Sequence, residues 1–195
     1  SDGGLHAGAR KPTNEPYASA KIAVLKRYDG YRDKNGGNYI SAMPTNRDGP
    51  GDNYHPKKSR VLRALVRRFH EAKVNGASEV VCWGTGSPRR EFLHVDDLAE
   101  ACLHLMDVHN DAGWVNVGTG EDVTIKELAE TVARVVGYEG ELVWDTTKPD
   151  GTPRKLLDVS KMTAVGWRAT TPLEQGIEAV YVDFQHALEH EVLRG

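Results

Sequence analysis

Strand-like segments alternate with helix-like segments along this chain, and that alternation constrains the fold more than any other feature of the sequence. Strand-like or extended segments are expected at residues 39–43, 79–83, 91–95, 114–117 and 142–144. One helix is expected at residues 15–32. Further helices are expected to begin at Val61, after Asp97 and at Pro172, and another to end at Gly137. Segments that alternate in this way build an α/β fold with a largely parallel sheet.

Local signals place several helix ends. Thr124 and Glu127 have the spacing of a capping box, and Gly137 is suited to end the helix that they open. Asp96 or Asp97 is expected to cap the preceding helix, because a carboxylate accepts hydrogen bonds from the free N–H groups of a first turn.

The helix from Val61 carries apolar residues on one face, and its arginines, Arg63 among them, are expected on the opposite, basic side. The stretch before this helix, residues 45–58, is rich in Asn, Asp, Gly and Pro. Such residues interrupt regular structure, so this stretch is expected to be loop.

The composition is that of an ordinary folded protein, with 195 residues, 39% hydrophobic and 27% charged. A formal charge of −3 gives no reason to expect nucleic acid or an anionic membrane as a partner. No apolar run approaches the roughly 20 residues that a membrane span needs. Cys82 and Cys102 lie in apolar runs and are expected to be buried, reduced thiols, as in a cytoplasmic protein.

The first ten residues are polar and rich in glycine, do not begin with Met, and lead directly into a proline-containing segment and a helix. A loop inside a protein has this character. The sequence is therefore expected to be part of a longer protein.

Tyr17 and Lys21 lie four residues apart on the first expected helix. This spacing places the phenol and the ammonium group on one face of the helix. A phenol with its ordinary pKa near 10 is a poor acid–base group at neutral pH, and a nearby positive charge lowers that pKa. By itself the pair is weak evidence, because surface helices contain this spacing by chance.

The Tyr17–Lys21 helix resembles the Tyr-x-x-x-Lys helix of the extended short-chain dehydrogenases, and further runs resemble the GDP-L-fucose synthase family within that group. The runs are residues 12–23, 43–46, 49–53, 67–72, 83–97, 116–120 and 148–158. The segment Lys148-Pro-Asp-Gly-Thr-Pro-Arg-Lys155 is the most specific of them. The resemblance covers nearly the whole chain from Pro12 onward.

This resemblance implies a partial Rossmann-like parallel sheet, lacking its N-terminal strands, together with a smaller mixed α/β substrate-binding domain. Residues 1–60 would be a remnant of the dinucleotide-binding domain. Residues 61–195 would form most of the domain that binds the GDP-sugar, with some segments returning to the Rossmann domain.

The family converts GDP-4-keto-6-deoxy-D-mannose into GDP-L-fucose by epimerisation at C3 and C5 and reduction at C4 with NADPH. The resemblance implies that Tyr17 supplies a proton and that Lys21 lowers the pKa of Tyr17 and holds the nicotinamide ribose. The implied cofactor-binding residues are Tyr17, Lys21, Asn46 and Arg60. The implied substrate-binding residues are Val61, Arg68, Trp83, Arg90 and Lys155. The resemblance also implies a cytoplasmic homodimer that contains no metal ion. The Tyr17 helix is a candidate dimer surface.

Three departures from the family pattern bear on activity. The sequence contains no Gly-x-x-Gly-x-x-Gly loop for a dinucleotide pyrophosphate, and the family's catalytic serine and epimerase cysteine have no counterpart. Arg60 stands where the family has an epimerase histidine, and arginine cannot exchange a proton at neutral pH; His55 is a less favoured substitute. Arg47 and Asp48 replace a usually apolar-aromatic pair beside the cofactor, which is expected to weaken cofactor packing.

Two further motifs are interpreted as structural. Gly84-Thr-Gly86 and Gly118-Thr-Gly120 lack the third glycine of a dinucleotide fingerprint and are expected to form turns. His94 has no second metal ligand at usable spacing, so it is expected to be packed or hydrogen-bonded.

Two alternatives stay open. The first is another nucleotide-sugar enzyme of the same superfamily, such as a 4,6-dehydratase or a 4-epimerase, which a panel of GDP- and dTDP-sugars would distinguish. The second is a catalytically silent chain that binds a GDP-sugar only. The missing glycine loop favours the second for the isolated polypeptide, and a test of dinucleotide binding would decide.

Overall fold

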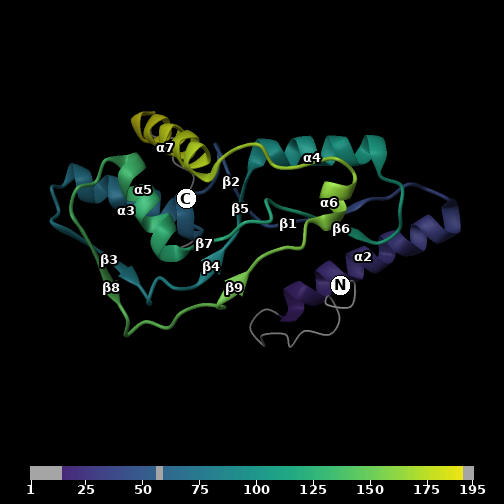
Figure 1. Ribbon diagram of the computed structural model, residues 1–195, viewed down its shortest axis with the longest axis horizontal. Coiled ribbons are helices and arrows are strands. Elements are labelled where there is room, and N and C mark those ends of the chain that lie inside the picture. Colours follow the sequence, from purple (N-terminus) through teal and green to yellow (C-terminus); the bar gives the residue numbers. More distant parts are fainter. Residues whose placement is uncertain (1–14, 56–58, 191–195) are drawn as a thin grey trace.

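The computed structural model describes residues 15–55 and 59–190 of the chain, and it contains alternating helices and strands (Figure 1). The helices are α2 (Glu15–Asn35), α3 (Val61–Val74), α4 (Val95–Val108), α5 (Ile125–Val136), α6 (Ser160–Ala164) and α7 (Leu173–Glu189). The strands are β1 (Ser41–Pro44), β2 (Asn46–Asp48), β3 (Glu79–Trp83), β4 (Arg89–Arg90), β5 (Phe92–His94), β6 (Trp114–Val117), β7 (Val123–Thr124), β8 (Glu141–Asp145) and β9 (Arg154–Lys155). The predicted α/β class is confirmed.

Most strand pairs are parallel, as expected. Strand β1 pairs with β6, β2 with β5 and β3 with β8, all in parallel. A fourth sheet has the order β7-β4-β9, in which β4 is parallel to β9 and antiparallel to β7. Parallel pairs need long crossover connections, and the helices supply them.

The apolar residues gather in two clusters. One cluster joins α3, α5 and α7 to β3, with Phe69, Leu128, Ile177 and Phe184 at or below 1% exposure. The other joins α4 and α6 to β5 and β6 through Leu93, Leu105, Val115 and Met162 among others. Figure 1 shows β4, β7 and β9 between these two parts of the molecule. Short strands in this position connect the two cores.

Strand β2 corrects the expectation that residues 45–58 are loop throughout. Asn46, Arg47 and Asp48 pair in register with Phe92, Leu93 and His94 of β5. Neither Asn nor Asp favours a strand by itself, but pairing with a strand that is anchored in the core satisfies their backbone groups. Sequence propensity therefore missed a strand that tertiary pairing creates.

The expected cap of α4 is also wrong. The N-cap is His94, whose ring accepts from the N–H of Asp96 at 3.4 Å, so His94 is a hydrogen-bonded histidine as expected. The carboxylate of Asp97 turns away from the helix end and accepts from the backbone of Thr170 at 3.3 Å and of Thr171 at 3.1 Å. Because β5 runs directly into α4, the last strand residue takes the cap position.

A third correction concerns Arg63, which was expected on the basic, solvated side of α3. Arg63 is only 2% exposed. Its guanidinium group lies against two carboxylates from the 48–52 segment, so charge pairing replaces hydration. The helix face that faces this segment is therefore less apolar than its periodicity indicates.

The cysteines are free thiols, with Cys82 buried and Cys102 half-buried. Across residues 15–55 and 59–190, no helix combines the length and apolar character needed to cross a bilayer. Within the same ranges, no three His, Cys, Asp or Glu side chains gather into a group that could hold a metal ion.

The capping box of α5 is confirmed, and it yields a stability prediction. The Thr124 side chain accepts from the N–H of Glu127 at 3.0 Å, and the Glu127 carboxylate accepts from the N–H of Thr124 at 2.7 Å. The helix ends at Gly137 in the left-handed conformation. We expect Thr124→Ala to lower the free energy of unfolding by about 1 kcal/mol, because it leaves the N–H of Glu127 without its acceptor. Urea unfolding of both proteins measures this, and an unchanged midpoint would contradict it.

Candidate functional site

The sheet β7-β4-β9 brings two of the predicted substrate-binding cations together. Arg90 of β4 and Lys155 of β9 are direct partners in the parallel pairing. Partners across neighbouring strands project from the same face of a sheet. The two cationic side chains therefore leave the sheet on the same face, an arrangement suited to a diphosphate.

The segment between Lys148 and Lys155 passes close to both Trp83 and Arg90. The Lys148 Nζ atom lies 6.0 Å from the centroid of the Trp83 ring. The Asp150 carboxylate accepts from the N–H of Thr85 at 2.9 Å and from its hydroxyl at 2.7 Å. Trp83 is 67% exposed, so one large aromatic surface is open to a ligand beside this segment.

Gly151 explains part of the character of that segment. A Cβ atom at this position would lie 3.0 Å from Nη2 of Arg90, closer than such contacts normally allow. The absence of a side chain lets the backbone pass directly over the guanidinium group. The segment that is most specific in the sequence therefore frames the Arg90 side chain.

A pocket of about 330 Å³ opens beside Arg90. Its walls come from Phe92, from the 119–123 segment and from residues 169–173. A cation at the edge of a concave surface is a common way to hold an anionic ligand.

Arg68 and Val61 lie on α3, seven residues apart and so on one face of the helix. Arg68 donates to the carbonyl oxygen of Val81 at 3.0 Å, two residues before Trp83 on β3. It also lies beside the thiol of Cys82, whose pKa is raised by burial and lowered in part by this charge. Arg68 thus lies against β3, the strand that ends at Trp83.

Asn46 lies on β2 and is joined to the site through the backbone of Glu91. Its side-chain amide donates to the carbonyl oxygen of Glu91 at 2.8 Å. Glu91 directly follows Arg90 in the chain. Asn46, the predicted cofactor-binding residue, is therefore hydrogen-bonded to the neighbour of Arg90, a predicted substrate-binding residue.

Glu91 is a residue that sequence reasoning missed. It is 0% exposed. Its carboxyl group accepts from the N–H of Gly120 at 2.9 Å and from the N–H of Leu157 at 3.0 Å. A Cβ atom on Gly118 would collide with this carboxyl group. The signal in the sequence that could have indicated a buried carboxyl group was a glutamate directly before the apolar Phe92.

The two Gly-x-Gly stretches are turns that receive carboxyl groups, as the turn interpretation expects. Gly84 has φ +82° and Gly120 has φ +77°, both in the left-handed region. A side chain at Gly84 would collide with the carboxylate of Asp150, and the N–H of Gly120 is bonded to Glu91. In each turn a backbone N–H is already bonded to a carboxylate, that of Thr85 to Asp150 and that of Gly120 to Glu91.

A buried ion pair holds the segment that follows Asn46. Nη2 of Arg63 lies 3.3 Å from Oδ1 of Asp48, contacts the carboxylate of Asp52 and donates to the carbonyl of Arg47 at 2.9 Å. Burial raises the pKa of Asp48 to about 6, against the opposing charges of Arg63 and Arg60. Asp48 therefore points into the protein, away from the surface where it was expected to weaken cofactor packing.

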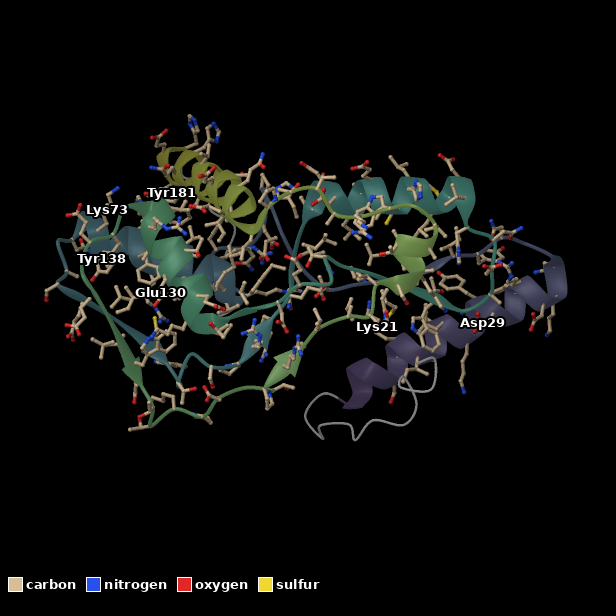
Figure 2. All side chains as sticks on the ribbon, in the orientation of Figure 1. Lys21, Asp29, Lys73, Glu130, Tyr138 and Tyr181 are labelled. Atoms are coloured by element: carbon tan, nitrogen blue, oxygen red, sulfur yellow. The ribbon has the colours of Figure 1, made fainter. Side chains whose placement is uncertain are left out.

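Arg60 is the N-cap of α3 and makes no side-chain capping bond. Tyr17 and Lys21 both lie within α2, as predicted, although the side chain of Tyr17 is outside the described part of the structure. Lys21 is exposed, and Figure 2 shows it on α2. The cofactor-binding roles of Tyr17, Lys21, Asn46 and Arg60 stay predictions.

Parallel strand pairs linked by helices define a Rossmann-like α/β protein. The chain belongs to the NAD dependent epimerase/dehydratase family, whose model matches residues 5–118.

Three comparisons narrow the position within this family. The chain is 59% identical over 177 residues to GDP-L-fucose synthase 1 of Arabidopsis thaliana, covering 91% of the chain and 55% of that relative. It is 51% identical over 187 residues to GDP-L-fucose synthase of Escherichia coli K12, covering 91% and 58%. A GDP-L-fucose synthetase structure from Naegleria fowleri bound to NADP superposes with a TM-score of 0.87 at 28% identity, covering 97% and 61%. The chain thus spans about half the length of the curated relatives it matches.

Proposed function

We propose that this chain is the substrate-binding part of a GDP-L-fucose synthase, an enzyme that converts GDP-4-keto-6-deoxy-D-mannose into GDP-L-fucose with NADPH. The observation that carries the proposal is the pairing of Arg90 with Lys155 in strand register, at the end of the 148–155 segment whose first lysine lies 6.0 Å from the centroid of the exposed Trp83 ring. The identities of 51–59% to GDP-L-fucose synthases support it.

In this proposal each group binds a different part of the nucleotide. Arg90 and Lys155 bind the diphosphate, because paired cations form charge-assisted hydrogen bonds with phosphate oxygens. Trp83 provides a flat surface for the guanine base. Arg68 and Val61, on one face of α3, complete the pocket on the side of β3.

The cofactor fits this chain only in part. Asn46 and Lys21 are suited to the nicotinamide end, where NADPH would supply hydride to the sugar C4. In the described part of the chain, the carboxyl group of Asp150 occupies the turn at Gly84–Gly86, and that of Glu91 occupies the turn at Gly118–Gly120. Neither turn therefore forms a cradle for the cofactor pyrophosphate.

Tyr17 would provide the proton for the sugar O4, with its pKa lowered by the charge of Lys21. Arg60 would stabilise an enolate by its charge during epimerisation, but it cannot carry the proton. A whole enzyme with Arg60 is expected to epimerise less efficiently than it reduces.

The remaining parts of the proposal concern organisation. Residues 1–60 would belong to the dinucleotide-binding domain, and residues 61–195 mostly to the substrate domain. We propose a cytoplasmic homodimer for the whole enzyme. Apolar side chains exposed on α2, among them Val24, Tyr28 and Tyr31 at 40–49%, support this helix as the dimer surface.

Calorimetric titration with GDP tests the proposal. We expect the chain to bind GDP, and we expect Arg90→Ala and Lys155→Ala each to weaken binding by about 10- to 100-fold, the usual effect of losing a charged hydrogen bond. Arg134→Ala is the matched control, because Arg134 pairs with Glu174 on the exposed surface of α5 and α7. Equal losses in all three variants would indicate a general charge effect and contradict the site.

A second candidate is a silent chain that binds a GDP-sugar without NADPH, which the occupied glycine turns favour. Titration with NADPH separates the two: binding would show that a cofactor site exists, and its absence would favour the silent chain. Preference for dTDP-sugars over GDP-sugars would instead indicate a dehydratase or 4-epimerase.

A further inference from the structure

Asp122 lies between two arginines from different strands. Its carboxylate accepts from Nε of Arg89 at 2.8 Å and forms an ion pair with Nε of Arg154. The Asp122 side chain is 3% exposed, whereas those of Arg89 and Arg154 are 41% and 60% exposed. The carboxylate is thus enclosed by the two guanidinium groups, which lower its pKa by hydrogen bonding and keep it ionised at neutral pH.

The two arginines occupy a defined place in the sheet. Arg89 of β4 is the register partner of Arg154 of β9, and the next pair along is Arg90 with Lys155. Successive side chains of a strand point to opposite faces. Asp122 joins β4 to β9 through the register pair next to Arg90 and Lys155, and Asp122 and Arg90 both line the pocket of about 330 Å³.

The contact of Asp122 with Arg89 and Arg154 is important for the pairing of β4 with β9 because these strands are short. Strands β4 and β9 contain two residues each. So short a parallel pair has few backbone hydrogen bonds to fix its register, and a shift by one residue would move Lys155 to the other face. The carbonyl of Asp122 also accepts from Arg89, at 2.8 Å, which fixes this arginine at a second point.

We propose that Asp122 is a positioning residue for the nucleotide diphosphate: by joining Arg89 to Arg154 it holds Arg90 and Lys155 in the register in which both reach the same phosphate-bearing ligand. The inference rests on the proposed GDP-binding function and adds to it a residue that acts through Arg89 and Arg154.

A purely electrostatic role for Asp122 gives the opposite result. A carboxylate near two cations repels an anionic ligand, so removing its charge would raise the affinity for GDP a few-fold. A positioning role predicts that the same change lowers the affinity. The sign of the effect therefore separates the two explanations.

The test is titration of the whole chain and its Asp122→Asn variant with GDP and with guanosine. We expect Asp122→Asn to weaken GDP binding by about tenfold, because a displaced Arg90 or Lys155 loses one charged hydrogen bond to the diphosphate. Guanosine has no phosphate, so its binding should be unchanged. Asp122→Glu, which keeps the charge, should recover part of the affinity. Glu130→Gln, an equal charge change on the exposed face of α5 (Figure 2), should have no effect. Unchanged or tighter GDP binding by Asp122→Asn would overturn the inference.

Hydrogen exchange provides a readout that does not depend on any ligand. The N–H of Arg89 donates to the carbonyl of Pro153 at 2.7 Å, which reports the β4–β9 contact. We expect this amide to exchange at least tenfold faster in Asp122→Asn, with the amides of α5 unchanged. Equal exchange rates would overturn the positioning role even if the chain bound no GDP. Faster exchange in a chain that binds no GDP would support the role of Asp122 in joining β4 to β9 and would reject the proposed function.

Discussion

Replacing Arg63 with methionine is expected to lower the free energy of unfolding by about 3–5 kcal/mol, the usual result of breaking a buried ion pair from one side. Arg63 is 2% exposed and Asp48 is 6% exposed. The substitution leaves Asp48 as a charge without its partner in the interior, and Oδ2 of Asp48 already has no hydrogen-bond partner within the described structure. Chemical denaturation at pH 7 measures the change.

The double variant Asp48→Leu with Arg63→Met is the decisive control. Apolar side chains of similar size often replace a buried pair at little cost, so we expect the double variant to lie within about 1 kcal/mol of the original protein. Lys126→Met, which removes an exposed pair with Glu130, should change stability by less than about 0.5 kcal/mol. If the double variant were as unstable as Arg63→Met, the loss would come from packing of the arginine stem.

The same pair sets a dependence on pH. Since burial raises the pKa of Asp48 in the folded protein to about 6, the folded state binds a proton more tightly than the unfolded state. The Asp48 contribution to stability therefore increases as the pH falls from about 7 towards 4. The destabilisation by Arg63→Met should shrink over this interval, because a protonated Asp48 needs no cation. A loss that stayed constant down to pH 5 would contradict this account.

Replacing Glu91 with alanine is expected to lower the free energy of unfolding by about 3 kcal/mol and to remove measurable GDP binding. The change leaves the N–H groups of Gly120 and Leu157 without an acceptor, at about 1–3 kcal/mol for each buried group. Leu157 lies two residues after Lys155, and Glu91 follows Arg90, so both proposed diphosphate contacts lose their support. Denaturation and calorimetry on the same samples measure the two effects.

Glu91→Gln refines this prediction. It keeps one acceptor oxygen but turns an NH₂ group towards a backbone N–H, so we expect about half the loss seen with alanine. Glu100→Ala, on the exposed surface of α4, is the control and should stay within about 0.5 kcal/mol. Full stability of Glu91→Ala would show that water replaces the carboxyl group and that Glu91 does not organise the site.

The sequence predicted features that depend on neighbours along the chain. The α/β class, the capping box of Thr124 and Glu127, and the left-handed Gly137 were all visible because helix periodicity and capping involve residues within one or two turns. The resemblance could be seen from runs of residues, and the match over residues 5–118 confirms the wider NAD dependent epimerase/dehydratase family. The roles of the individual site residues were predicted in the same way and stay predictions.

Tertiary structure alone decided what joins these segments. The sequence by itself determined which residues are available: the cations Arg90 and Lys155, and the carboxyl groups that support them. That these cations become neighbours follows from the register of β4 and β9, which are far apart in the sequence. The strand at β2 and the buried position of Arg63 arise in the same way. Local periodicity could reveal neither, because a charge becomes stable in the interior, and a polar segment becomes a strand, only when partners from elsewhere in the chain satisfy their polar groups.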